Sequence, residues 1–122
     1  MARSEEDDIR AVIQLYIDGA REGNVEKVKQ AFHPQARMSG YLQGTLLIAG
    51  PEPFYEAVTN APAPVKSGEP YKSEIVRLDV AGPVASATLE EGPYLGMQFT
   101  TFFHLIRVEG RWQIVSKTFM HR

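Results

Sequence analysis

Tyr16 and His33 are the two side chains that this sequence offers first for acid–base catalysis. Tyr16 could donate a hydrogen bond from the apolar stripe of an N-terminal helix, and His33 can gain or lose a proton near neutral pH. Glu74, Glu90 and Glu91 are possible general bases, and either Glu90 or Glu91 must face inward whichever register their strand adopts. Structural alternatives stay open: a core tyrosine, a histidine at a helix end, and solvated glutamates.

Other kinds of catalytic and cofactor sites are not indicated. The chain has no cysteine, and it lacks a nucleophilic serine elbow, a phosphate-binding loop and a dinucleotide fingerprint. Its histidines, His33, His104 and His121, are scattered without a carboxylate at ligand spacing. We therefore expect no metal site and no cofactor.

Composition indicates an ordinary globular protein. The 122 residues are 43% apolar and 23% charged, with a net charge of −2, and they fit one domain over residues 1–122. The absence of a basic stripe argues against nucleic acid as a partner. The opening residues are too acidic for a signal peptide and no apolar run could span a membrane, so we expect no membrane partner and a cytoplasmic protein.

The strongest pattern lies at the end of the chain. Residues 97–108 and 111–120 are rich in β-branched and aromatic residues, and Glu109-Gly110 between them suits a tight hairpin turn. We expect these strands at the centre of the sheet. With regular pairing from Val108–Arg111, the partners are Arg107–Trp112, Leu105–Ile114, Phe103–Ser116, Thr101–Thr118 and Phe99–Met120, all on one face.

That register assigns roles to the two faces of the sheet. The helix-covered face should line a pocket for a small apolar or aromatic ligand, made by Tyr16, Met38, Tyr55, Phe99, Thr101, Phe103, Ser116, Thr118 and Met120. The other face is also partly apolar, so we expect a homodimer interface there, with Phe102, His104, Val115, Lys117 and Phe119. On an outer face, Lys117 would stack on a ring or pair with an acid of a second subunit rather than form a Schiff base.

Helices precede the sheet. Ser4 and the acidic residues after it predict a helix from about Glu5 to Gly23, with an apolar stripe of period 3.6. Asn24 predicts a second short helix that stops at His33-Pro34, and Pro51 predicts a third. Two short strands within residues 37–48, a proline-rich loop over residues 60–70 and strands at 71–80 and 84–91 complete the pattern. Helices segregated from an antiparallel sheet define an α+β fold.

The ending Phe99-Thr-Thr-Phe-Phe-His-Leu, then Gly110-x-Trp112 and Lys117-x-Phe119, resembles the nuclear transport factor 2-like (NTF2-like) superfamily. The resemblance covers essentially the whole chain and is nearest to the branch described as putative lumazine-binding, close to the SnoaL-like polyketide cyclases and ketosteroid isomerases. It implies a cystatin-like cone, a bent mixed or antiparallel sheet around a long N-terminal helix, with an apolar pocket inside. It also implies frequent homodimers through the outer sheet face.

The resemblance leaves the activity open. Relatives imply an acid after Phe-Thr in a Phe-Thr-Asp-Tyr pattern, where this chain has Thr101. The change removes a candidate general base and favours a binding domain without chemistry of its own. A cofactor-independent isomerase, dehydratase or hydrolase that uses Tyr16 with a glutamate or His33 remains the alternative. A pure protein-interaction module with a filled cone is a third possibility.

Overall fold

The computed structural model describes residues 4–122, so the start of the acidic opening, residues 1–3, lies outside the described residues. The first helix, α1 (Glu5–Glu22), begins at Ser4, whose hydroxyl accepts a hydrogen bond from the amide of Asp7, while the Asp7 carboxylate accepts one from the amide of Ser4. This reciprocal cap satisfies two amides that a helix start leaves unpaired. Gly23, with a φ of 71°, ends the helix as expected.

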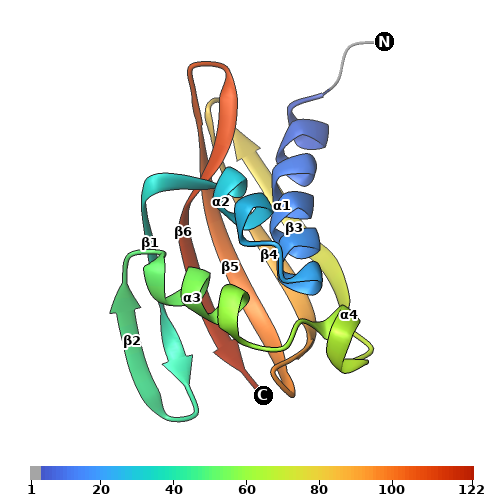
Figure 1. Cartoon of the computed structure of the whole chain (residues 1–122). Helices are drawn as coiled ribbons and strands as arrows, with labels where there is room; N and C mark the ends of the chain where they lie inside the picture. The colour runs from blue at the N-terminus through green and yellow to red at the C-terminus, as the bar shows by residue number, and fades with distance from the viewer. Residues whose placement is uncertain (1–3) are drawn as a thin grey trace.

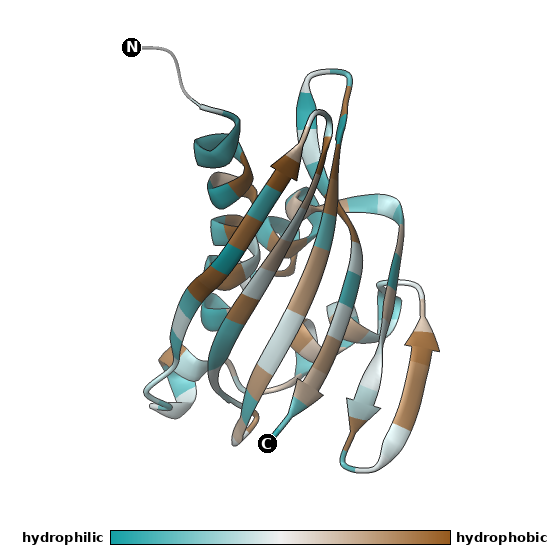
Figure 2. Ribbon diagram, turned by 180° about the vertical axis from the view of Figure 1, so that it is seen from behind, coloured by the Kyte–Doolittle hydropathy of each residue, from teal (hydrophilic) through white to brown (hydrophobic). Residues whose placement is uncertain are grey.

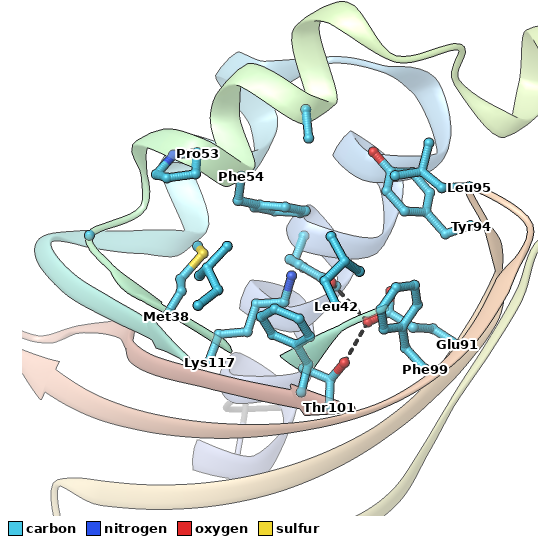
Figure 3. A pocket seen from close by; sticks show the side chains of 15 residues that line it. Met38, Leu42, Pro53, Phe54, Glu91, Tyr94, Leu95, Phe99, Thr101 and Lys117 are labelled. Carbon is cyan, nitrogen blue, oxygen red and sulfur yellow. Dashed lines mark hydrogen bonds between the residues drawn. The ribbon is translucent and has the colours of Figure 1, made fainter. Parts of the chain in front are cut away.

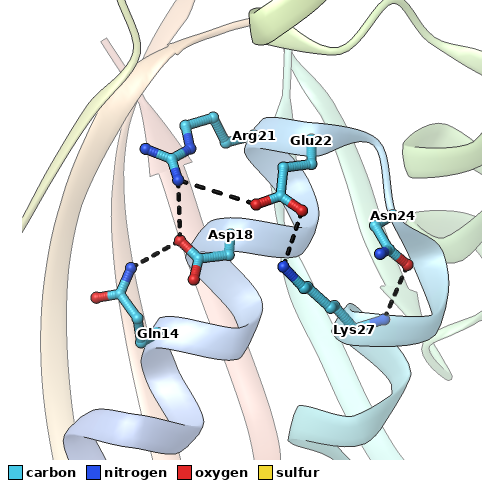
Figure 4. A network of polar contacts seen from close by, with 6 residues as sticks. All are labelled: Gln14, Asp18, Arg21, Glu22, Asn24 and Lys27. Atoms are coloured by element: carbon cyan, nitrogen blue, oxygen red, sulfur yellow. Dashed lines mark hydrogen bonds and ion pairs between the residues drawn. The ribbon is translucent and has the colours of Figure 1, made fainter.

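A tight turn joins α1 to α2 (Val25–Ala31). Asn24 caps α2 by accepting a hydrogen bond from the amide of Lys27, and the Lys27 amine pairs with Glu22 at 2.9 Å (Figure 4). The same network links Arg21 to Asp18 on α1. These contacts join the end of α1 to the start of α2.

Six strands form one mixed sheet in the order β2-β1-β6-β5-β4-β3, and the helices lie on one side of it (Figure 1). Among residues 4–122, only β1 and β6 pair in parallel, and the other neighbours are antiparallel. The last two strands are central, as the sequence predicted. The strand bounds are β1 (Phe32–Leu42), β2 (Thr45–Ala49), β3 (Lys72–Ala81), β4 (Val84–Tyr94), β5 (Met97–Val108) and β6 (Arg111–His121).

The hairpin turn forms as predicted, but the register changes halfway along the hairpin. Glu109 and Gly110 both have positive φ values, 51° and 79°, as a two-residue hairpin turn requires. Pairing is regular as far as Leu105–Ile114, and then a bulge at Val115 shifts it, so that His104 pairs with Ser116. Because side chains alternate between faces, one extra residue reverses the face of every later residue of β6. The expected partners Phe103–Ser116, Thr101–Thr118 and Phe99–Met120 are therefore wrong.

The core lies between α1 and the inner face of the sheet. The apolar stripe of α1 supplies Ile9, Ile13 and Tyr16, each at most 2% exposed, and the hairpin supplies Phe103 and Trp112. The start of α1 is also held by polar contacts, because Glu5 accepts a hydrogen bond from the Trp112 indole and pairs with Arg107. Phe99 and Trp112 thus share the helix-covered face, as expected.

Two further helices cover the edge of the core. Helix α3 (Glu52–Asn60) starts after Pro51, as predicted, and the proline-rich segment contains one short helix, α4 (Pro64–Ser67). The second helix stops earlier than predicted, at Ala31, and His33 belongs to β1. Within residues 4–122 no helix is long and apolar enough to cross a membrane.

Candidate functional site

A cavity opens between the inner face of the sheet, α1 and α3 (Figure 3). Its volume is about 100 Å³, and its wall is mostly apolar. Every strand except β3 contributes to the wall. The lining residues are Tyr16, Met38, Leu42, Leu47, Gly50, Pro53, Phe54, Ala57, Glu91, Tyr94, Leu95, Phe99, Thr101, Lys117 and Phe119.

The polar groups of the cavity converge on Glu91, a carboxylate that is only 5% exposed. Its Oε2 accepts hydrogen bonds from the hydroxyls of Tyr16, at 2.8 Å, and Thr101, at 2.9 Å (Figure 3). Its Oε1 accepts a third hydrogen bond, from the Tyr71 hydroxyl at 2.7 Å. A carboxylate has about four acceptor positions, so these three donors leave one open, on Oε1.

The tyrosines around Glu91 stay protonated. Burial, reinforced by the nearby Glu91 carboxylate, raises the pKa of Tyr16 and of Tyr71 well above the ordinary value of 10. The same two causes raise the pKa of Tyr94, at the end of β4, to about 12. All three phenols can therefore donate hydrogen bonds across the pH range in which proteins work.

Lys117 enters the same cavity from β6. The side chain is 6% exposed, and its amine lies 3.6 Å from the centre of the Phe54 ring (Figure 3). The rings of Tyr16 and Phe119 lie 5.0 Å and 5.3 Å away. Burial lowers the pKa of Lys117 to about 8, against the opposing attraction of Glu91, so a fraction of this amine is neutral near pH 7.

This arrangement suits acid–base chemistry on a small molecule. A carboxylate with one open acceptor position can take a proton, a protonated phenol can donate to an oxygen, and an amine lies in the same enclosure. Among residues 4–122, no three His, Cys, Asp or Glu side chains gather in a way that could hold a metal ion.

Several residues that the sequence assigned to the pocket do meet there. Tyr16, Met38, Phe99 and Thr101 all line the cavity. The structure also shows what stands at position 101 in place of the acid that the resemblance implies. The position lacks the expected acid, but its hydroxyl contacts a carboxylate that the neighbouring strand supplies.

The bulge in β6 overturns five other assignments. Because Val115 shifts the register, Thr118 and Met120 point to the outer face, where Met120 is 53% exposed, and Ser116 accompanies them. None of these three lines the pocket. The expected outer-face residues Lys117 and Phe119 instead face inward and line the cavity, so they are not interface residues.

The remaining predicted site residues lie elsewhere. Phe103 is fully buried in the core beneath Tyr16 rather than at the cavity wall. Tyr55 is half-buried on α3, where its ring faces Phe32. His33 is outside the cavity, and its Nδ1 accepts a hydrogen bond from the amide of Gln35, so the structure does not place it as a partner of Tyr16.

Sequence reasoning found Glu91 only as one of three glutamates, and it missed Lys117 and Tyr71. Strand alternation predicted that either Glu90 or Glu91 faces inward, and Glu91 is the one that does. Glu90 faces outward, where it accepts hydrogen bonds from Thr100 and Arg122. Lys117 had no such signal, because its face depends on the bulge.

In the part of the chain that the structure describes, no helix covers the outer face of the sheet (Figure 2). Phe102 is 51% exposed there, and His104 and the half-buried Val115 lie near it, on the face that the sequence assigned to an interface. Exposed apolar side chains continue across β1 and β2 at Tyr41 and Ile48.

Comparison with solved structures defines the class of fold. An NTF2-like protein of unknown function from Methylobacillus flagellatus superposes with a TM-score of 0.88 at 29% identity, over 100% of this chain and 95% of that chain. Another, from Shewanella baltica, gives a TM-score of 0.87 at 29% identity, over 97% of this chain and 94% of that chain. The protein therefore has the NTF2-like fold, which confirms the predicted fold class.

The family follows from the sequence itself. The model of the family described as putative lumazine-binding matches residues 4–120, and the chain belongs to that family. A curated relative, Aldolase FrzH from Cladobotryum sp, is 24% identical over 118 residues, which cover 95% of this chain and 90% of the relative.

Proposed function

We propose that this protein binds a small, mostly apolar carbonyl compound in the pocket and moves a proton at the carbon beside the carbonyl group. The buried Glu91 carboxylate, held by Tyr16 and Thr101 at the wall of an apolar cavity, is the observation that supports this most. The sequence favoured a binding domain because position 101 lacks an acid. Glu91 supplies a carboxylate from the next strand and favours the alternative, a cofactor-independent isomerase-type enzyme.

Each polar group has a place in such a reaction. Glu91 would remove the proton through the open position on Oε1, which leaves the electron pair of the C–H bond in an enolate. Tyr16 keeps its proton, and as Glu91 becomes protonated the Tyr16 hydroxyl would turn its hydrogen bond from Glu91 to the enolate oxygen. The apolar wall keeps water away and strengthens both interactions.

Two comparisons support a small carbonyl ligand. The family description, putative lumazine-binding, agrees with a small-molecule ligand. The related Aldolase FrzH has a name that denotes carbonyl chemistry, in which an enolate or its equivalent is formed before the carbon–carbon bond.

Exchange of carbon-bound protons with solvent tests the proposal. The apolar ketone 2-tetralone is incubated with the protein in D2O, and loss of the signals beside the carbonyl group is followed by NMR. Glu91→Gln removes the charge at nearly constant shape and should slow the catalysed exchange by about 100-fold or more. Tyr16→Phe should slow it by roughly 100-fold.

Glu90→Gln is the matched control, because Glu90 is the preceding residue of β4 and points to the outer face. It should exchange at the wild-type rate. Equal rates for the wild type and Glu91→Gln would contradict the proposal.

A binding domain without chemistry is the second candidate. The apolar wall and the three hydroxyl donors that already occupy Glu91 favour it. In that case 2-tetralone would bind in the pocket with no exchange above the buffer rate.

We also propose that the outer face of the sheet joins two copies of the chain. The middle of that face is uncharged and includes Phe102, Met120 and the half-buried Val115, whereas charged pairs such as Arg122–Glu90 and Arg77–Asp79 lie around it. An apolar centre with a polar rim is typical of protein interfaces. A second copy presents the same surface, which is self-complementary about a two-fold axis.

A further inference from the structure

Lys117 is the unusual residue of the pocket. Lysine is almost never buried unless it is paired, yet within residues 4–122 its amine makes no hydrogen bond and no ion pair. Among the described residues, every side-chain nitrogen or oxygen that is completely buried has a hydrogen-bond partner. The Lys117 amine has no such partner, so it is not completely buried. It therefore retains access to the cavity that Lys117 lines.

The position of Lys117 follows from the fold. The bulge at Val115 turns Lys117 from the outer face to the inner one, and Phe54 on α3 lies over its tip. The amine therefore shares one cavity with Tyr16 and Glu91, which come from two other elements. Three elements thus bring a nucleophile, an acid and a base together.

We propose that Lys117 forms a Schiff base with the carbonyl carbon of an aldehyde or ketone bound in this pocket. The inference rests on the proposed function and deepens it, since it gives the carbonyl compound a covalent route to proton transfer. Neutral amine is needed for the attack, and a lysine with a pKa of about 8 is neutral in roughly a tenth of the molecules at pH 7.

The steps balance without an oxidant or a reductant. The lone pair of the amine attacks the carbonyl carbon, a C–N bond forms, and the carbonyl π electrons move to oxygen. One proton from the amine nitrogen and a second from solvent reach that oxygen, which leaves as water, and an iminium that keeps the other amine proton remains. Glu91 then takes the proton from the adjacent carbon, and the C–H electrons form an enamine as the C=N electrons return to nitrogen. Reprotonation and addition of water release the product and the free amine.

The surroundings favour the charged intermediate. The rings of Phe54, Tyr16 and Phe119 face the nitrogen, and their π faces attract an iminium as they attract an ammonium. The negative charge of Glu91 acts in the same direction, as its effect on the pKa of Lys117 indicates. Tyr16 can turn its hydroxyl from Glu91 and donate a hydrogen bond to the departing oxygen.

Trapping with borohydride tests the Schiff base. The full-length protein is incubated with 2-tetralone, treated with sodium borohydride, digested and mapped by mass spectrometry. The expected product is Lys117 carrying the mass of one ketone less one oxygen atom. Trapping should increase with pH, with a midpoint near the pKa of Lys117 at about 8. Adducts spread over the other lysines, Lys27, Lys29, Lys66 and Lys72, without enrichment at Lys117 would overturn the proposal.

Two variants separate a covalent role from a charge effect. Lys117→Arg keeps a positive charge but cannot form an imine, and Lys117→Met keeps the length without charge. Both should lose the adduct and slow proton exchange by about 10-fold or more, while the exposed control Lys66→Arg should behave as wild type. Wild-type exchange in Lys117→Arg would overturn the Schiff base.

The result also separates the two proposals. Absence of an adduct on wild-type Lys117, with exchange that still depends on Glu91, would overturn only the Schiff base. A Lys117 adduct, together with a proton-exchange rate that is the same in Glu91→Gln as in the wild type, would support the Schiff base and contradict the proposed role of Glu91.

Discussion

At the scale of single residues, Glu91 and Lys117 are the two charged side chains buried within residues 4–122, and the Glu91 carboxylate favours the charged form of Lys117. Glu91 is stabilised by three hydroxyl donors, whereas Lys117 has only aromatic rings around its amine. A buried charge without hydrogen bonds costs stability. Lys117 should therefore be the less favourable of the two for folding, as functional residues often are.

The pH dependence of stability should expose this cost. The pKa of Lys117 is about 8 in the folded protein and 10.5 in its ordinary state, so only the unfolded chain holds this proton between those values. Stability should rise with pH through that window because the unfolded state binds more protons there. At pH 7, Lys117→Met should raise the free energy of unfolding by about 3 kcal/mol, from about 1.4 kcal/mol per pKa unit.

Urea unfolding at several pH values measures the effect. The difference between wild type and Lys117→Met should shrink from pH 8 toward pH 10.5, and Lys66→Met, at an exposed site, should show no such trend. A difference that is constant across this window would mean that Lys117 is not destabilised by its charge.

Residue types alone predicted part of the site. Tyr16 and Met38, which the sequence assigned to a pocket, both line the cavity, and helical period decides the face of Tyr16. Glu91 was limited to one of two neighbours by strand alternation. Tyr71 was missed because the sequence predicted it at the start of a strand, whereas it lies just before β3, where strand alternation does not decide the direction of its side chain.

At the scale of elements, the β6 bulge decides which chemistry the pocket holds. Regular pairing would place Ser116 and Thr118 inside, and the observed pairing places Lys117 and Phe119 there instead. Hydrophobic alternation could not reveal this, because both faces of β6 carry apolar and polar residues. The order of elements and the hairpin turn were predictable since caps, glycine and proline mark their ends.

The close approach of α1 and α2 gives a second test at this scale. A Cβ atom on Gly19 would lie 2.5 Å from Cγ2 of Val28 and 2.9 Å from the Val28 amide nitrogen. Gly19→Ala should lower the free energy of unfolding by about 1–3 kcal/mol, because the clash outweighs the gain of about 1 kcal/mol in helix propensity.

Chemical denaturation measures that change. Ala11→Gly, on the exposed side of α1, provides the reference for propensity alone and should lose about 1 kcal/mol. A Gly19→Ala variant more stable than the wild type would show that the two helices do not need their close contact.

At the scale of the whole molecule, the inner face of the sheet lines the pocket, whereas no helix of residues 4–122 covers the outer face (Figure 2). The proposed dimer would cover the outer face without occupying the pocket, which lies on the helix side of the sheet. Phe102→Glu places a charge in the middle of the outer face and should weaken dimerisation by about 10-fold or more, since central aromatic residues dominate such interfaces.

Sedimentation velocity across a range of concentrations measures the association. Val65→Glu, which adds the same charge at an exposed site on α4, is the matched control and should remain dimeric. A wild-type protein that stays monomeric at high concentration, or a Phe102→Glu variant that dimerises like the control, would refute the interface.

A crystal structure of the protein with 2-tetralone bound is the most direct measurement of the central claim, that the pocket orients a carbonyl compound for proton transfer. The ketone should lie against Phe54 and Met38, with its oxygen toward Tyr16 and Lys117 and the adjacent carbon within reach of Oε1 of Glu91. A ketone bound with its oxygen toward the apolar wall, or bound outside the pocket altogether, would contradict that claim.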